Sequence, residues 1–104
     1  MNQTETNAFF NVFHNLEDLY TRDLHDVDPE FLEGYDYVMD MIKDAIFDND
    51  EVGNLVDLDN FVNQADAYAD DFNGEYGRGY QMAVNVCLET ISKAWVSQLN
   101  KCGV

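Results

Sequence analysis

Apolar residues recur at steps of three and four along four stretches of the chain, which is the spacing of helices that bury one face. The first stretch, from about residue 5 to residue 24, has an apolar face of Phe9, Phe13, Leu16, Tyr20 and Leu24. The second starts at Pro29, which suits a first helical position, with Asp28 before it as the capping residue. This helix ends between residues 47 and 50, and its apolar face consists of Phe31, Tyr35, Val38, Ile42 and Ile46.

Two further helices follow a loop over residues 48–57 that contains Gly53. The third spans about residues 57–72, and Asn73 and Gly74 mark its end. Its apolar face consists of Leu58, Phe61, Val62, Ala65, Tyr68 or Ala69, and Phe72. The fourth spans about residues 75–100 and has the longest apolar face, which consists of Tyr76, Tyr80, Ala83, Val84, Cys87, Ile91, Trp95 and Leu99. No alternating run of apolar and polar residues indicates a strand. The chain of 104 residues fits one domain, so the pattern predicts a single acidic, all-α domain over residues 1–104, a small bundle of about four helices.

A weak internal repeat relates the second and fourth helices. Glu30-Phe31-x-x-Gly34-Tyr35 matches Glu75-Tyr76-x-x-Gly79-Tyr80 at an offset of 45 residues. A glycine followed by an aromatic residue inside a helix permits a close helix crossing, because glycine has no side chain to keep a neighbour away. With the helix that precedes each copy, the repeat predicts two helical hairpins of similar build; the alternative is a chance likeness of two amphipathic helices.

The net charge of −16 lies in the middle of the chain. Residues 23–75 hold seventeen of the 21 acidic residues and a single base, Lys43, whereas the charges outside this stretch cancel. Such a charge attracts cationic partners and argues against direct binding to nucleic acid or to a membrane surface. No stretch approaches the roughly 18 consecutive apolar residues of a membrane span. Residues 1–8 lack the features of a signal peptide, so we expect a cytoplasmic protein.

No pattern of catalytic residues stands out. His14 and His25 are the two histidines and lack the spacing of metal ligands, and carboxylate pairs are too common here to mark an acid–base site. Cys87, on the apolar face of the fourth helix, is expected to be a buried free thiol. We therefore expect a binding protein rather than an enzyme, with no cofactor and no bound metal.

Acidic residues step by three and four along the second helix, opposite its apolar face. Like charges at this spacing repel by about 0.2–0.5 kcal/mol per pair, and only Lys43 interrupts them. One interpretation is a solvated face that maintains solubility; the one we favour is a surface that presents negative charge to a basic partner. The candidate partner-binding residues are Glu33, Asp36, Asp40, Asp44, Asp48, Asp50, Glu51, Asp57, Asp59, Asp66 and Asp70.

In its small size, its many Asp, Asn, Phe and Tyr residues and its helical pattern, the chain resembles the acidic inhibitors that phages encode against host defences. These include anti-restriction DNA mimics and anti-CRISPR proteins. The resemblance is one of composition over the whole chain and transfers no functional residue. It implies a phage protein in the bacterial host cytoplasm that blocks the nucleic-acid-binding groove of a defence complex by mimicry and steric competition.

Two other functions fit the sequence. An interaction or immunity module would bind a basic protein partner through an apolar surface, which exposed Tyr or Phe side chains would reveal. The long apolar face of the fourth helix is a candidate homodimer surface, unless this helix is the centre of the core.

A calcium-binding helical protein is the other alternative. The loop from Asp48 to Asp59 matches the spacing of an EF-hand loop at Asp48, Asp50 and Gly53. Val52 at a ligand position, and Asp59 where the bidentate Glu is usual, weigh against it.

Overall fold

The computed structural model describes residues 3–21, 28–47 and 52–102, with the side chains of residues 20–21 and 97–102 excepted. It contains the helices α1 (Gln3–Thr21), α2 (Pro29–Phe47), α3 (Leu55–Ala67) and α4 (Gly74–Cys102), and a short 3-10 helix η1 (Ala69–Asp71). These ranges contain no strand, which confirms the predicted small all-α bundle. None of their helices is both long and apolar enough to cross a membrane.

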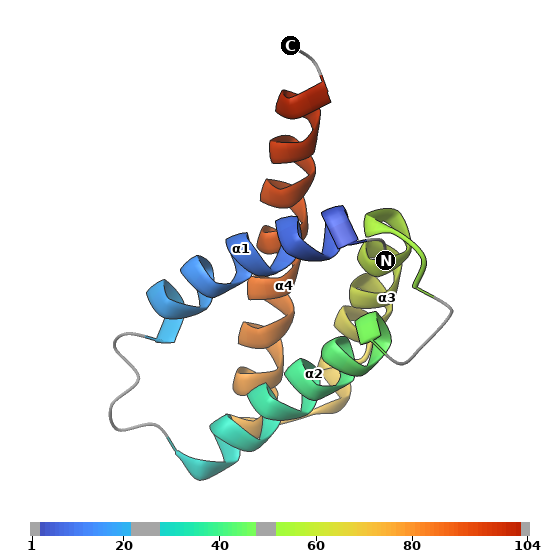
Figure 1. Ribbon diagram of the computed structural model, residues 1–104. Coiled ribbons are helices and arrows are strands. Elements are labelled where there is room, and N and C mark those ends of the chain that lie inside the picture. The colour runs from blue at the N-terminus through green and yellow to red at the C-terminus, as the bar shows by residue number, and fades with distance from the viewer. Residues whose placement is uncertain (1–2, 22–27, 48–51, 103–104) are drawn as a thin grey trace.

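α4 is the central helix of the bundle. The other three helices pack on it as far as about Ala94, and its C-terminal end projects beyond them (Figure 1). Ala83, Val84, Val86 and Cys87 have no exposed surface, and together they cover nearly half of the helix circumference. The long apolar sequence of α4 is therefore explained by packing against all three other helices. Its predicted apolar face does not stay buried throughout, because Trp95 is 41 % exposed.

α2 and α4 cross at two glycines, one from each helix. A methyl group added at Gly34 would collide with the carbonyl oxygen of Tyr76, and one added at Gly79 would collide with the carbonyl oxygen of Phe31. The two backbones are therefore in direct contact, with no side chain between them at this point. This contact is the most extensive that α4 makes with another helix.

The crossing explains the internal repeat. Each glycine lies against the aromatic residue three positions before the other glycine, so the two copies form the two halves of one reciprocal contact. The predicted pair of similar hairpins is only partly present: α3 packs on α4, but α1 packs mainly on α4 as well, rather than along α2. The structure thus relates α2 and α4 to each other more closely than it relates the two pairs.

Side chains close the starts of α2 and α3. Asp28 Oδ1 accepts a hydrogen bond from the Glu30 N–H at 2.8 Å, as its predicted capping role requires. α3 begins at Leu55, two residues before the predicted Asp57, because Asn54 Oδ1 accepts from the Asp57 N–H at 2.9 Å. Glu5 of α1 also accepts from the Leu55 N–H at 2.8 Å, so a carboxylate lies at the positive end of α3.

The third predicted helix also ends earlier than expected, at Ala67, and continues as η1 rather than as a regular helix to residue 72. The chain then turns into α4 at Gly74, whose φ of +67° lies in the left-handed region. Glycine adopts this conformation without the steric cost that other residues have. The Asn73-Gly74 break predicted from the sequence is confirmed in this position.

We expect Gly34→Ala and Gly79→Ala each to lower the free energy of unfolding by about 3 kcal/mol or more, because the added methyl forces the two backbones apart. Chemical denaturation followed by circular dichroism measures the change. The double variant should cost clearly less than the sum of the single variants, because the first methyl already opens the shared crossing.

Gly53→Ala is the matched control, since its added methyl meets only the side-chain end of Asp57. We expect a change within about 1 kcal/mol for this variant. A Gly34→Ala variant as stable as the control would contradict the direct backbone contact.

Cys87 is fully buried, and this burial raises the pKa of its thiol to about 12. In a Cys102→Ser variant, which leaves Cys87 as the one cysteine, we expect a thiol reagent to label the protein only after denaturant unfolds it. The burial contributes stability that is complete below the ordinary thiol pKa of 9.0 and is lost as the pH rises towards 12. Rapid labelling in native buffer would contradict this.

Candidate functional site

Four of the predicted acidic residues form one continuous exposed face on α2. Glu33, Asp36, Asp40 and Asp44 are all exposed and follow one another at steps of three and four residues. With a rise of about 1.5 Å per residue, they span roughly 16 Å along the helix. We call these four residues the acidic face. Lys43 is the one base on α2.

The acidic residues of α3 and η1 point in several directions. Asp57 lines a small pocket with Phe61 and Gln64, and its Oδ2 accepts a hydrogen bond from the Gly53 N–H at 3.0 Å. Asp59 lines a different pocket, between α3 and the C-terminal half of α4. Asp66 Oδ1 accepts from Gln81 Nε2 on α4 at 3.0 Å. The predicted set is therefore not one surface, and only part of it can meet the same partner.

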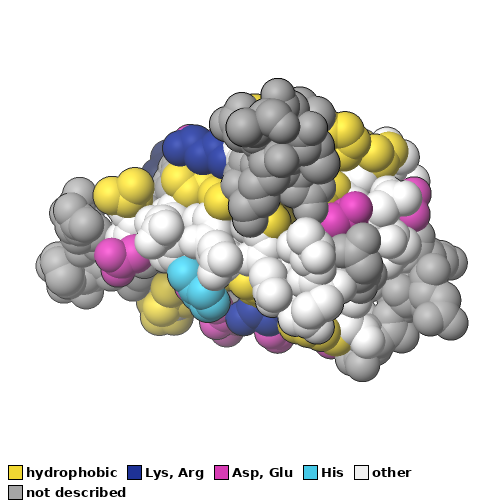
Figure 2. Space-filling model, turned by 45° about the horizontal axis from the view of Figure 1, so that its top comes forward, with side chains coloured by type: hydrophobic (Ala, Val, Ile, Leu, Met, Phe, Trp, Pro, Cys, Tyr) yellow, Lys and Arg dark blue, Asp and Glu magenta, His cyan; other side chains and the backbone are white. Residues whose placement is uncertain are grey.

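Asp70 is exposed in η1, beyond the end of α3. The predicted residues Asp48, Asp50 and Glu51 lie outside the described residues. Figure 2 shows that acidic side chains are scattered on the face it displays, between hydrophobic and neutral polar side chains. The acidic face on α2 is the one regular row of exposed carboxylates among the described helices.

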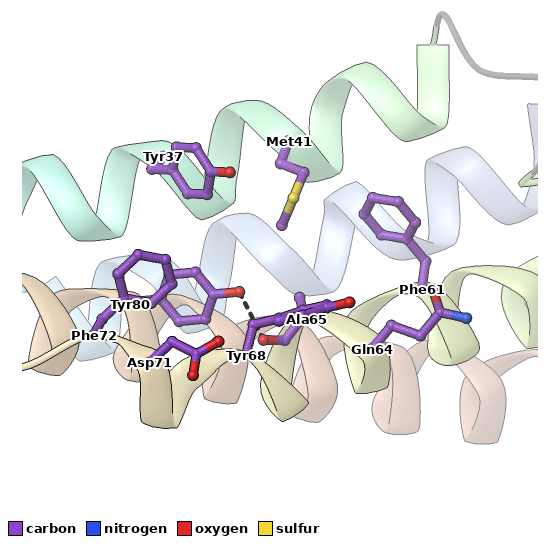
Figure 3. Close-up of a pocket in the computed structure, with 9 residues that line it drawn as sticks. All are labelled: Tyr37, Met41, Phe61, Gln64, Ala65, Tyr68, Asp71, Phe72 and Tyr80. Carbon is purple, nitrogen blue, oxygen red and sulfur yellow. Dashed lines mark hydrogen bonds between the residues drawn. The ribbon is translucent and has the colours of Figure 1, made fainter.

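A groove lined with aromatic residues separates α2 from α3. It contains a pocket of about 390 Å³, and Tyr37 and Met41 reach into it from α2. Phe61 of α3 and Tyr68, the residue that follows α3, form the opposite wall (Figure 3). Tyr37 is 50 % exposed and Tyr68 is 62 % exposed, so both rings are available to a partner. We call this the aromatic groove.

The closed end of the aromatic groove is held rigidly. Tyr80 of α4 is buried, and its hydroxyl donates a 2.6 Å hydrogen bond to the carbonyl oxygen of Ala65, which fixes the ring against α3. The Tyr80 ring packs on Phe72 with centroids 4.7 Å apart and on Tyr37 with centroids 6.3 Å apart. Three rings therefore form a connected wall before any ligand arrives.

The electrostatics of the aromatic groove are negative. Asp71 of η1 lines the pocket, and no Lys, Arg or His does so among the described residues. Burial raises the pKa of the Tyr80 hydroxyl, and Tyr37, Tyr76, Asp66 and Asp71 raise it further in that order. Burial, the largest of these causes, disfavours charge of either sign, so the negative character of the groove comes from its carboxylates.

Sequence reasoning missed the aromatic groove because it assigned apolar residues to the core. Tyr68 was expected on the buried face of α3, whereas it is mostly exposed. Tyr37 and Met41 were not assigned to any face, yet they form an i,i+4 pair at the edge of the α2 apolar stripe. The sequence signal for the aromatic groove was this pair together with Tyr68, which has acidic residues close to it at positions 66, 70 and 71.

A second apolar pocket of about 380 Å³ lies between α3 and α4, lined among others by Val56, Leu88, Trp95 and Val96. It lies in the part of α4 where acidic and basic residues balance, since Glu89 pairs with Lys93 at 3.4 Å. This pocket coincides with the surface on which a homodimer was predicted, and that prediction stays open.

The alternative of a calcium loop over residues 48–59 receives no support from the described part of that loop. α3 already begins at Leu55, and the oxygens of Asn54 and Asp57 accept backbone N–H hydrogen bonds there. Asp48 and Asp50 lie outside the described residues. Within the described ranges, no group of three or more His, Cys, Asp or Glu side chains is arranged to hold a metal ion.

Comparisons of the chain with protein-family models, with curated protein sequences and with solved structures give no match.

Proposed function

We propose that this protein binds a basic, nucleic-acid-binding partner and occupies the surface with which that partner holds nucleic acid. The observation that carries the proposal is the acidic face, four exposed carboxylates in one row on α2. A row of like charges destabilises the helix that bears it, so a role in binding gives a reason for its presence. Inhibition of a host defence complex, as by anti-restriction or anti-CRISPR proteins, is the form of this function that we favour.

Mimicry of a nucleic-acid strand needs more negative charge than α2 presents by itself. Successive carboxylates on α2 lie about 4.5–6 Å apart along the helix axis, whereas the phosphates of one DNA strand are about 3.4 Å apart along the duplex. α2 alone is therefore sparser than DNA. Asp57 and Asp71, which line pockets beside Phe61 and Tyr68, add negative charge along the neighbouring groove.

The exposed aromatic side chains support a second contribution to binding. Tyr37 and Tyr68 are more exposed than tyrosines with a purely structural role need to be, and aromatic residues commonly anchor interfaces. An apolar contact to a basic protein, as in an interaction or immunity module, is thus the second candidate. Binding of this apolar kind would differ from mimicry, because neither high salt nor competing nucleic acid would release the partner.

The test uses the triple variant Asp36→Asn/Asp40→Asn/Asp44→Asn as bait in a nuclease-treated bacterial lysate, beside the unchanged protein. We expect the unchanged protein to retain a nucleic-acid-binding complex that duplex DNA displaces and that high salt releases. The triple variant should bind this complex about tenfold more weakly or worse. Its melting temperature should rise slightly, because two like-charge pairs at i,i+4 are removed.

The matched control carries Asp18→Asn, Glu75→Gln and Glu89→Gln, which changes the net charge equally but leaves α2 and the other candidate partner-binding residues untouched. We expect this control to bind almost as well as the unchanged protein, since it keeps the acidic face. Its fold should also be retained, because exposed ion pairs such as Glu75–Arg78 contribute little to the free energy of unfolding. Equal weakening of both variants would show that only total charge matters. Capture that is indifferent to DNA, to salt and to the triple change would refute mimicry and favour the apolar module.

A further inference from the structure

The aromatic groove offers a preformed site for a flat cation. Tyr37 and Tyr80 lie with their rings 26° from parallel, and Tyr80 is fixed by its hydrogen bond to Ala65. A cation within about 6 Å of the centre of an aromatic ring is attracted by the negative face of that ring. The pocket of about 390 Å³ is large enough to admit a side chain between the α2 and α3 walls (Figure 3).

Carboxylates surround this pocket on two sides. Asp71 lines it at the end where η1 meets α4. On α2, Glu33 and Asp40 stand four residues before and three after Tyr37, so helix geometry places them beside this residue. The groove therefore combines an apolar interior with a negative rim, which complements a side chain that is positive at its tip and apolar along its stem.

We propose that the aromatic groove is a binding site for an arginine side chain of a protein partner. The guanidinium group would stack on the Tyr37 ring and donate hydrogen bonds to the Asp71 carboxylate, while Met41 and Phe61 contact the methylene stem. This inference rests on the proposed function in one respect only, namely that a basic partner protein supplies the arginine. The site itself is a property of the chain alone and can be tested without that partner.

Arginine fits this groove better than the other occupants of similar size. The ammonium group of lysine is compact and strongly hydrated, so it gains less from stacking on a flat ring. An uncharged apolar side chain would bury the Asp71 carboxylate without a positive partner, which costs free energy. A planar cation satisfies both the rings and the carboxylate.

The experiment titrates the protein with a short capped peptide that carries one central arginine between glycine and serine residues, at about 0.15 M salt to screen diffuse attraction. Lysine and citrulline versions are the comparison probes, because citrulline keeps the planar shape of arginine and loses the charge. NMR shifts of the backbone amides report affinity and position together. We expect the shifts to centre on Tyr37, Tyr68 and Asp71, with arginine binding at least about threefold tighter than lysine and about tenfold tighter than citrulline.

The variants Tyr37→Ala/Tyr68→Ala and Asp71→Asn test the rings and the carboxylate separately. Both tyrosines are largely exposed, so their loss should leave the fold intact, which circular dichroism verifies. We expect about tenfold weaker binding of the arginine peptide by the double variant, the effect of ~1.4 kcal/mol. Trp95→Ala and Asp59→Asn, which make the same kinds of change at the α3–α4 pocket, should bind the peptide as the unchanged protein does.

Three results would overturn the proposal. Equal affinity for the arginine and lysine peptides, with no effect of the tyrosine variant, would show diffuse attraction by the net charge. Equal affinity for the arginine and citrulline peptides would show a neutral apolar site. Shifts centred on Trp95 would place the site in the other pocket. In each case, DNA-competed capture of a basic complex would still support the proposed function, so the two proposals fail independently.

Discussion

The backbone contact between α2 and α4 at Gly34 and Gly79 is the constraint on which the rest of the structure depends. It fixes how close the two helices come, and so it determines how the apolar residues of α2 meet the central helix. α1 and α3 then pack on α4 at the positions that α2 leaves open. Since α3 packs mainly on α4 and only slightly on α2, the facing edges of α2 and α3 stay apart and leave the aromatic groove between them.

The same arrangement separates two kinds of surface on α2. Its buried side, with Val38 and Ile42, belongs to the core, and its outer side bears the acidic face. Tyr37 and Met41 lie between these two sides, where apolar and charged positions meet. On the proposed function, a partner that approaches α2 would meet charge first and aromatic rings next. Long-range attraction and short-range contact would then act in sequence during one binding event.

The fold could be predicted from the sequence because the strongest signals are local. The Asp28-Pro29 start of α2 and the Asn73-Gly74 break each depend on neighbouring residues, and both are confirmed. The internal repeat also contains Gly34 and Gly79, the two glycines at which α2 and α4 cross. The groove was not predicted, because the exposure of Tyr37 and Tyr68 depends on how far α3 stands from α2. The directions of Asp59 and Asp66 depend on α4 in the same way, which periodicity within one helix does not report.

The reciprocal form of the crossing has a consequence for the stability of the fold at low protein concentration. A contact in which each side presents the same motif to the other is the kind that joins two identical subunits around a two-fold axis. Such a dimer falls apart on dilution, since its halves must find each other. Here both halves belong to one polypeptide, and the linked segments have a high effective concentration for each other. The core can therefore form within a single polypeptide chain, whatever the protein concentration.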